Sequence, residues 1–273
     1  MTMTSKQNWI VGSSSSAVHA ATPEVVYAYE KVGLGAMEIS LPWDQYDTVD
    51  FPALKKASDE TGVQLWSLHL PFDGQLSIAH AEKAVREKSV RMNLELMKKA
   101  ADVGITHSVI HPGTEPTLPS DRAERLKESA ENLHLLAEAG LKMGMTLCIE
   151  ELPRTCPGNC AAEMQQLLAA HPALRSCFDT NHLLGESHED YLNAVGNSIV
   201  TLHVSDYDFI DERHMLPGEG KVDWKAVMAH LESLGYSGPW MYEVSLEPAP
   251  NRRTGPVLSL EDLVENFKWL KTL

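Results

Sequence analysis

Short apolar runs alternate along the chain with longer amphipathic stretches. The apolar runs occupy residues 9–11, 36–39, 63–70, 108–111, 146–150, 176–178, 199–204 and 239–244, and we interpret them as strands. Helical start and stop signals bound amphipathic stretches at residues 22–33, 79–103, 120–144, 187–196, 224–234 and 259–273. The serine run at residues 13–16 is interpreted as a loop between a strand and a helix.

Strands that alternate with helices predict a parallel sheet. Eight such units in 273 residues favour a closed barrel over an open sheet, since a (β/α)8 barrel needs about 250 residues. We therefore expect one α/β domain, a TIM barrel over residues 1–273, with no linker inside it. The glycine-rich loops of the common nucleotide-binding motifs are missing from the sequence, which excludes the simplest nucleotide-binding functions.

The chain is acidic, with a net charge of −15 and a pI near 5.2. An acidic surface repels phosphate backbones, and the pair Arg252-Arg253 is too short to form a basic groove, so no nucleic-acid partner is expected. The apolar stretch before residues 18–21 is too short for a signal peptide, and no segment approaches the roughly 20 apolar residues of a membrane span. We expect a cytoplasmic protein without a membrane partner.

The four cysteines give little evidence for a metal site of their own. Cys148 and Cys177 lie inside apolar runs, where a thiol behaves as a small buried hydrophobe. Cys156 and Cys160 form a loop pair, whereas a structural zinc site needs four ligands.

Polar side chains recur where the later predicted strands end, which is the end that carries the active site in this fold. These residues are His69, His111, Glu150, Asp179, His182, His203 and Glu243. Taken singly, such a histidine is more often a hydrogen-bonded structural residue, and such a glutamate is more often solvated. Several carboxylates in one barrel mouth are costly, however, unless a cation neutralises them.

We therefore predict a divalent-metal site whose ligands are Glu150, Asp179, His203 and Glu243. Three carboxylates and one imidazole suit Mn²⁺, Mg²⁺ or Co²⁺ and tolerate Zn²⁺. Glu150 and Glu151 compete for one position, because neighbouring strand residues face opposite sides. If Leu147 and Ile149 pack outward on the helices, Glu150 is the residue that faces the interior.

The segments at residues 178–182, 202–206 and 213–220 (FDTNH, LHVSD and RHMLPGEG) resemble the xylose isomerase-like superfamily over nearly the whole chain. That group includes sugar isomerases, ketose 3-epimerases, inosose dehydratases, hydroxypyruvate isomerases and the endonuclease IV enzymes. The resemblance implies the same four metal ligands. It also implies an isomerase or epimerase of a small sugar, sugar acid or cyclitol, in which the metal stabilises an enediolate and Glu150 and Glu243 move the proton.

The resemblance gives expectations for the residues around the metal as well. His182 would hold a substrate oxygen, His69 and His111 would line the pocket, and His214 would close it, with Arg213 beside it. Trp43, Trp66 and Phe72 would supply an apolar wall, although a place in the core or rim explains them equally well. Two departures count against a ketose 3-epimerase in particular. Cys156 stands where those enzymes have Glu, and Phe209 stands where they have Arg.

Several alternatives stay open. His69, His111, His182 and the pair Glu212 and His214 also resemble ligands for additional zinc ions in the endonuclease IV group, so a trinuclear DNA-repair nuclease is one alternative. The acidic surface, the missing basic loops and the shortened spacing from His203 count against it. A second zinc in a sugar enzyme, an inosose-dehydratase-like lyase and a binding module without activity are others. Related proteins often form oligomers, so a homo-oligomer is possible.

Overall fold

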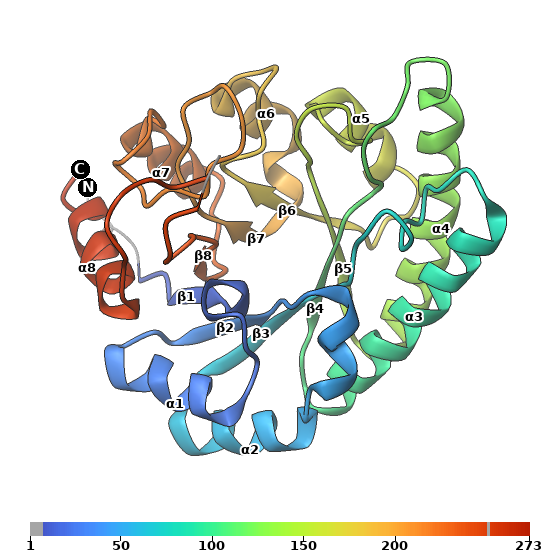
Figure 1. The fold of residues 1–273 in the computed structure, drawn as a ribbon. Helices are drawn as coiled ribbons and strands as arrows, with labels where there is room; N and C mark the ends of the chain where they lie inside the picture. Colours follow the sequence, from blue (N-terminus) through green and yellow to red (C-terminus); the bar gives the residue numbers. More distant parts are fainter. Residues whose placement is uncertain (1–7, 250–251) are drawn as a thin grey trace.

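The computed structural model describes residues 8–249 and 252–273, and it shows eight parallel strands surrounded by helices (Figure 1). The strands are β1 (Val11–Ser14), β2 (Ala36–Ile39), β3 (Gln64–His69), β4 (His107–Ile110), β5 (Thr146–Glu150), β6 (Arg175–Asp179), β7 (Ile199–His203) and β8 (Trp240–Tyr242). From β1 to β7 each strand pairs with its sequence neighbours, and β1 also pairs with β8. An isolated parallel bridge between Val204, which directly follows β7, and Tyr242 of β8 closes the barrel. The predicted TIM barrel is confirmed.

Eight α-helices follow the strands in the described residues. They are α1 (Pro23–Val32), α2 (Phe51–Thr61), α3 (Lys83–Asp102), α4 (Arg122–Met143), α5 (Ala161–Leu168), α6 (His188–Val195), α7 (Trp224–Ser233) and α8 (Leu260–Leu270). None of these helices is both long and apolar enough to cross a membrane.

Two of these helices, α2 and α5, were not among the six predicted ones. The signals for α2 are present, because Asp50 caps Ala53 N–H at 3.0 Å and Gly62 ends the helix with a left-handed φ of 81°. Helix α5 has eight residues and no side-chain cap at Cys160, so the sequence marks its start only weakly.

The first strand lies further along the chain than its apolar pattern suggests. It was predicted at residues 9–11 and lies at Val11–Ser14, while Ser15 begins a short 3-10 helix, so the expected serine loop is wrong. Hydrogen bonds allow the serines to be buried at this strand end. The Ser15 hydroxyl donates to the carbonyl of Ser40 at 2.9 Å, which offsets the cost of removing this polar group from water.

Side chains of the strands alternate between two layers. Leu147 and Ile149 belong to the large outer core under the helices, whereas Cys148 packs with Val109 and Cys177 inside the barrel. The alternation places Glu150 on the inner side, as predicted. Cys148 and Cys177 are the small buried groups that their sequence context indicated.

Gly12 sets how closely β1 approaches its neighbours. A Cβ at this position would lie 2.8 Å from the carbonyl oxygen of Ala36 and 3.0 Å from Cε of Met241. We expect Gly12→Ala to lower the free energy of unfolding by about 1–3 kcal/mol, measured by urea denaturation. Gly185→Ala is the matched control, because its added Cβ would meet nothing within 4 Å. Equal stability of the two variants would contradict the argument.

Candidate active site

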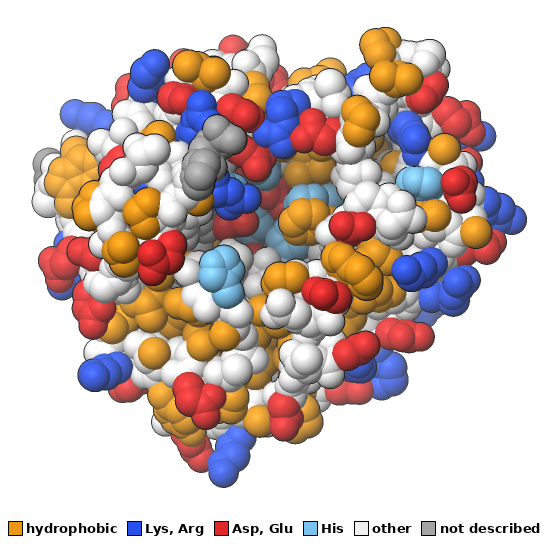
Figure 2. Space-filling model, in the orientation of Figure 1, with side chains coloured by type: hydrophobic (Ala, Val, Ile, Leu, Met, Phe, Trp, Pro, Cys, Tyr) orange, Lys and Arg blue, Asp and Glu red, His pale blue; other side chains and the backbone are white. Residues whose placement is uncertain are grey.

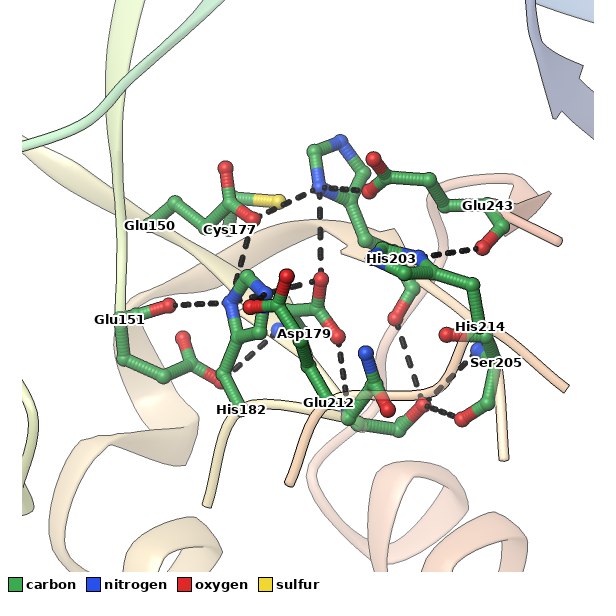
Figure 3. A network of polar contacts seen from close by, with 12 residues as sticks. Glu150, Glu151, Cys177, Asp179, His182, His203, Ser205, Glu212, His214 and Glu243 are labelled. Atoms are coloured by element: carbon green, nitrogen blue, oxygen red, sulfur yellow. Dashed lines mark hydrogen bonds and ion pairs between the residues drawn. The ribbon is translucent and has the colours of Figure 1, made fainter. Parts of the chain in front are cut away.

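The four predicted metal ligands meet at the carboxyl ends of the strands. Glu150 ends β5, Asp179 ends β6, His203 ends β7, and Glu243 directly follows β8. One ligand atom from each lies within 4.8 Å of those of the other three. Figure 3 shows Glu150 and Glu243 on either side of one nitrogen of the His203 imidazole. We call these four residues the carboxylate cluster.

The donor atoms of the carboxylate cluster fit a cation. Nδ1 of His203 lies 3.1 Å from Glu150 Oε1, 2.9 Å from Glu243 Oε2 and 3.9 Å from Asp179 Oδ2. One imidazole nitrogen cannot satisfy three carboxylates. Asp179 Oδ2 and Glu243 Oε2 are buried without a hydrogen-bond partner, which is costly in a site that no cation neutralises.

The pKa shifts report the same crowding of negative charge. Burial together with Glu243 and Glu150 raises the pKa of Asp179 well above its ordinary value. Burial acts in the same direction on Glu150 and Glu243, but the charge of His203 outweighs it. The pKa of Glu150 is therefore held low, and that of Glu243 falls to about 2.

His69 and His111 form a second group with the other oxygen of Glu150. Oε2 of Glu150 lies 3.1 Å from Nε2 of His69 and 3.3 Å from Nε2 of His111. The ring of Phe72 stacks on His111 with centroids 3.9 Å apart. The ligand atoms of His69, His111 and Glu150 also have metal-ligand spacing, so this carboxylate can serve two cation positions.

His182 and His214 are oriented by backbone carbonyls. Nδ1 of His182 lies 2.8 Å from the carbonyl of Glu151, and Nδ1 of His214 lies 3.0 Å from that of Glu243. When these nitrogens carry the protons, each Nε2 is left as an acceptor. Within residues 8–249 and 252–273, the metal-like groups number two, and neither includes His182, Glu212 or His214.

The structure places Arg213 on the loop after β7. Its Nε donates to Asp208 Oδ2 at 2.8 Å, and its backbone N–H donates to the side chain of Asn181. Arg154 and Arg252 line the cavity at the barrel mouth, and neither was predicted as a site residue.

A cavity of about 300 Å³, the inner chamber, opens over both groups. Its lining includes His69, His111, Glu150, His182, His214 and Glu243. Figure 2 shows this hollow, with histidines at its base. The polar lining suits a ligand rich in hydroxyl groups, because each buried polar group needs a partner.

The predicted apolar wall is only partly present. Phe72 lines the inner chamber, and Trp43 lines a neighbouring cavity that shares Phe72 with it. Trp66 instead stacks on His107, with centroids 4.3 Å apart, and donates to Thr201 at 3.1 Å. Its expected place in the wall is wrong, because His107 begins β4 and thus lies at the opposite end of the barrel.

Glu38 is a part of the site that the sequence reasoning missed. This wholly buried residue of β2 has carboxylate oxygens 3.0 and 3.1 Å from Nε2 of His203, and it accepts a hydrogen bond from Ser67 at 2.8 Å. A carboxylate behind a ligating histidine fixes its tautomer and raises its basicity. The sequence feature that could have indicated Glu38 is the presence of a glutamate inside the short apolar run at residues 36–39.

Glu151 supports the cluster from the outer layer. Its side chain accepts hydrogen bonds from the backbone N–H of Asp179 at 2.8 Å and from the hydroxyl of Tyr191 at 3.0 Å. Burial and the nearby Asp179 raise the pKa of Glu151 well above its ordinary value. The neighbouring residues Glu150 and Glu151 therefore have different surroundings, as strand alternation predicted.

Asp206 anchors the loop that carries His214. Its carboxylate accepts hydrogen bonds from the backbone N–H groups of Gly218 and Val222 and from the indole of Trp224. A Cβ on Gly220 would lie 2.3 Å from Asp206 Oδ1, so only glycine allows this approach. The loop is therefore held by one buried carboxylate.

Glu38→Gln tests the link between Glu38 and the metal site. We expect the dissociation constant for Mn²⁺, measured by calorimetry, to rise about 10–100-fold, because the amide no longer polarises His203. The metal-free protein should keep or gain thermal stability, since the substitution removes a buried negative charge. Glu265→Gln, at an exposed ion pair of α8, is the control. Unchanged Mn²⁺ affinity of Glu38→Gln would show that Glu38 does not act through His203.

Comparison with curated proteins gives partial matches. An uncharacterized protein of Methanocaldococcus jannaschii is 26% identical over 181 residues, which cover 63% of this chain and 61% of that protein. The fructoselysine 3-epimerase of Escherichia coli O157:H7 is 30% identical over 116 residues, which cover 40% of this chain and 42% of the epimerase. The matches thus span about half the length of these relatives.

Solved structures match over nearly the whole chain. A D-tagatose 3-epimerase-like protein superposes with a TM-score of 0.80 at 21% identity, covering 96% of each chain. A D-psicose 3-epimerase crystallised in the presence of D-fructose has a TM-score of 0.80 at 16% identity, covering 96% of this chain and 98% of the other. These likenesses show the fold. The family model for the xylose isomerase-like TIM barrel matches residues 26–273, so the chain belongs to that family.

Proposed function

We propose that the protein is a divalent-metal-dependent isomerase or epimerase of a small sugar, sugar acid or cyclitol. The carboxylate cluster carries the proposal, because Glu150 and Glu243 line the inner chamber and also face one shared cation position. The structural likeness to sugar epimerases and the partial match to a fructoselysine epimerase support this choice of chemistry.

Glu150, Asp179, His203 and Glu243 would hold the metal. Three carboxylates and one imidazole suit Mn²⁺, Mg²⁺ or Co²⁺ and also accept Zn²⁺. When bound, the metal would supply Lewis-acid polarisation of a substrate carbonyl, which acidifies the neighbouring C–H.

Glu150 and Glu243 are the proposed acid and base. His203 holds their pKa values below the ordinary range, so both carboxylates are ionised at neutral pH before a substrate binds. They flank Nδ1 of His203 (Figure 3). One would remove a proton from a carbon placed between them, and the other would first take a proton from solvent and then return it to the opposite face of that carbon. Nε2 of His182 and Nε2 of His214 would accept hydrogen bonds from substrate hydroxyls.

Cys156 lines the inner chamber where ketose 3-epimerases have Glu, and Phe209 packs on Tyr207 with centroids 4.5 Å apart where they have Arg. These two departures are why we propose no specific 3-epimerase. An inosose-dehydratase-like lyase is the alternative that uses the same acid and base.

A trinuclear zinc nuclease is the less favoured candidate. Its third metal would need His182 with Glu212 and His214, and the described residues contain two metal-like groups, neither with these three. Nε2 of His182 lies 3.7 Å from Glu212 Oε2. The net charge of −15 also opposes binding to phosphate backbones. The group of His69, His111 and Glu150 leaves room for a second ion, for example zinc.

Solvent exchange tests the proposed chemistry. In D₂O with Mn²⁺ and a panel of ketoses, sugar acids and cyclitols, we expect deuterium to enter a carbon next to the carbonyl of at least one substrate, measured by NMR. Glu243→Gln should lower the exchange rate at least about 100-fold, because a general acid–base group is worth about 10²–10⁴ in rate. Glu95→Gln, at an exposed site on α3, is the control. Cleavage of abasic-site DNA without exchange into any substrate would refute the proposal.

Metal content tests the number of cation sites. After chelation and reloading, we expect one tightly held Mn²⁺ or Mg²⁺ per chain, measured by elemental analysis. His69→Asn should leave this ion in place, because His69 contacts Glu150 Oε2 and lies outside the carboxylate cluster. About three zinc ions per chain would instead favour the nuclease. Loss of the single ion in His69→Asn would show that the two groups share it.

A further inference from the structure

A second cavity continues from the inner chamber towards the loops after β1, β2 and β8. This outer chamber has a volume of about 480 Å³, and its lining includes Ala17, Leu41, Trp43, Val244, Leu246 and Ala249. Phe72, His214, Glu243 and Arg252 line both chambers. An occupant of the outer chamber would therefore be continuous with a ligand at Glu243.

The two volumes together exceed what a simple sugar needs. Ligand sites span about 300–1,000 Å³, and drug-sized molecules fill them. The inner chamber alone, at about 300 Å³, is at the small end of that range and suits a single sugar unit. A free sugar bound there would leave the outer chamber to solvent.

The linings of the two chambers differ in chemistry. The inner chamber offers imidazoles and carboxylates that can pair with hydroxyls. Half of the residues that line the outer chamber are aliphatic or aromatic, and apolar atoms form most of its wall. His19, Glu247 and Arg252 are its exposed charged or titratable residues. Ser16, Ser40 and Ser245 also line it, but hydroxyls of a second polar unit would find few partners along Trp43, Phe72 and Leu246, and an unpaired buried polar group is costly.

Two aromatic side chains of the outer chamber are unusually accessible. Trp43 is 41% exposed and Phe72 is 46% exposed. Phe72 also stacks on His111, so it connects the apolar wall to the residues around Glu150. Exposed aromatic rings at the edge of a pocket supply large contact area and offset stacking to a ring of the ligand.

We propose that the natural substrate is a sugar that carries an apolar substituent containing a ring. The outer chamber binds this substituent while the sugar unit occupies the inner chamber. The inference rests on the proposed function for the chemistry at Glu150 and Glu243. Trp43, Phe72 and Leu246 would contact the substituent, and Arg252 lies where the two chambers join.

Matched substrates test this inference. From the ketose that exchanges fastest, benzyl and methyl ethers are prepared at each terminal hydroxyl, and kcat/KM for deuterium exchange is measured for each. We expect the benzyl ether at one terminus to exceed its methyl counterpart at least about tenfold, since added apolar contact in a pocket gives discrimination of about 10–200-fold. Trp43→Ala should bring this ratio close to one. Leu135→Ala, at a 57% exposed position of α4, should preserve it.

Each outcome has a distinct meaning. Exchange with equal kcat/KM for both ethers at both termini would overturn the inference and leave the proposed function intact. A preference for the benzyl ether that persists in Trp43→Ala would also overturn it. If Trp43→Ala keeps the benzyl-to-methyl ratio of kcat/KM of the unsubstituted protein but changes its oligomeric state, measured by sedimentation, the wall would instead contact a second copy of the chain.

A failure of the proposed function can be separated from a failure of this inference. If no sugar exchanges, calorimetry with the benzyl and methyl ethers of the ketoses in the panel measures binding without turnover. Tighter binding of the benzyl ether that depends on Trp43 would support the outer chamber as a binding site, even though the proposed reaction had failed. Equal affinity for the benzyl and methyl ethers would overturn the inference.

Discussion

The interaction on which the site depends is the crowding of carboxylates around His203. Glu150, Asp179 and Glu243 face one edge of its imidazole, and Glu38 faces the other. Burial, together with Glu243 and Glu150, raises the pKa of Asp179 although His203 acts in the opposite direction. Such an arrangement is costly for folding unless a cation compensates it, so binding of a cation would stabilise the mouth. Glu151 accepts a hydrogen bond from the backbone of Asp179, and Asp206 accepts one from Val222, so both carboxylates fix the backbone around the cluster.

The barrel makes this crowding possible because it separates two kinds of burial. Leu147 and Ile149 bury apolar surface under the helices, while the inward positions of the same strand carry Cys148 and then Glu150. The small residues Val109, Cys148 and Cys177 fill the interior below the mouth. The apolar stability thus comes mainly from the outer layer, and the upper interior can be polar.

Much of this arrangement is predictable from the sequence, for identifiable reasons. The strands of a parallel barrel end on one side, so residues at the ends of apolar runs, such as Glu150 and His203, must meet. Glu38 escapes that logic because its contact with His203 crosses the barrel, and a single strand pattern does not report which side chains meet across an interior. Trp66 was expected at the mouth but does not lie there. It stands three positions before His69, too far down the strand to reach the mouth, and it stacks on His107 instead. Arg154 and Arg252 were not predicted for a third reason. Side chains on loops are positioned by local ion pairs, such as Arg154 with Asp211, that no periodicity encodes.

Glu150 links the number of bound ions to the proposed chemistry. Its Oε1 belongs to the carboxylate cluster, and its Oε2 faces His69 and His111. A carboxylate that binds a cation through each oxygen is a weaker base than one that binds a single cation, so a second ion would leave Glu243 as the stronger base. If His69 and His111 instead hold substrate oxygens, Oε2 of Glu150 stays available for proton transfer. A sugar isomerase or epimerase that uses two glutamates therefore works best when the second group holds no metal during turnover.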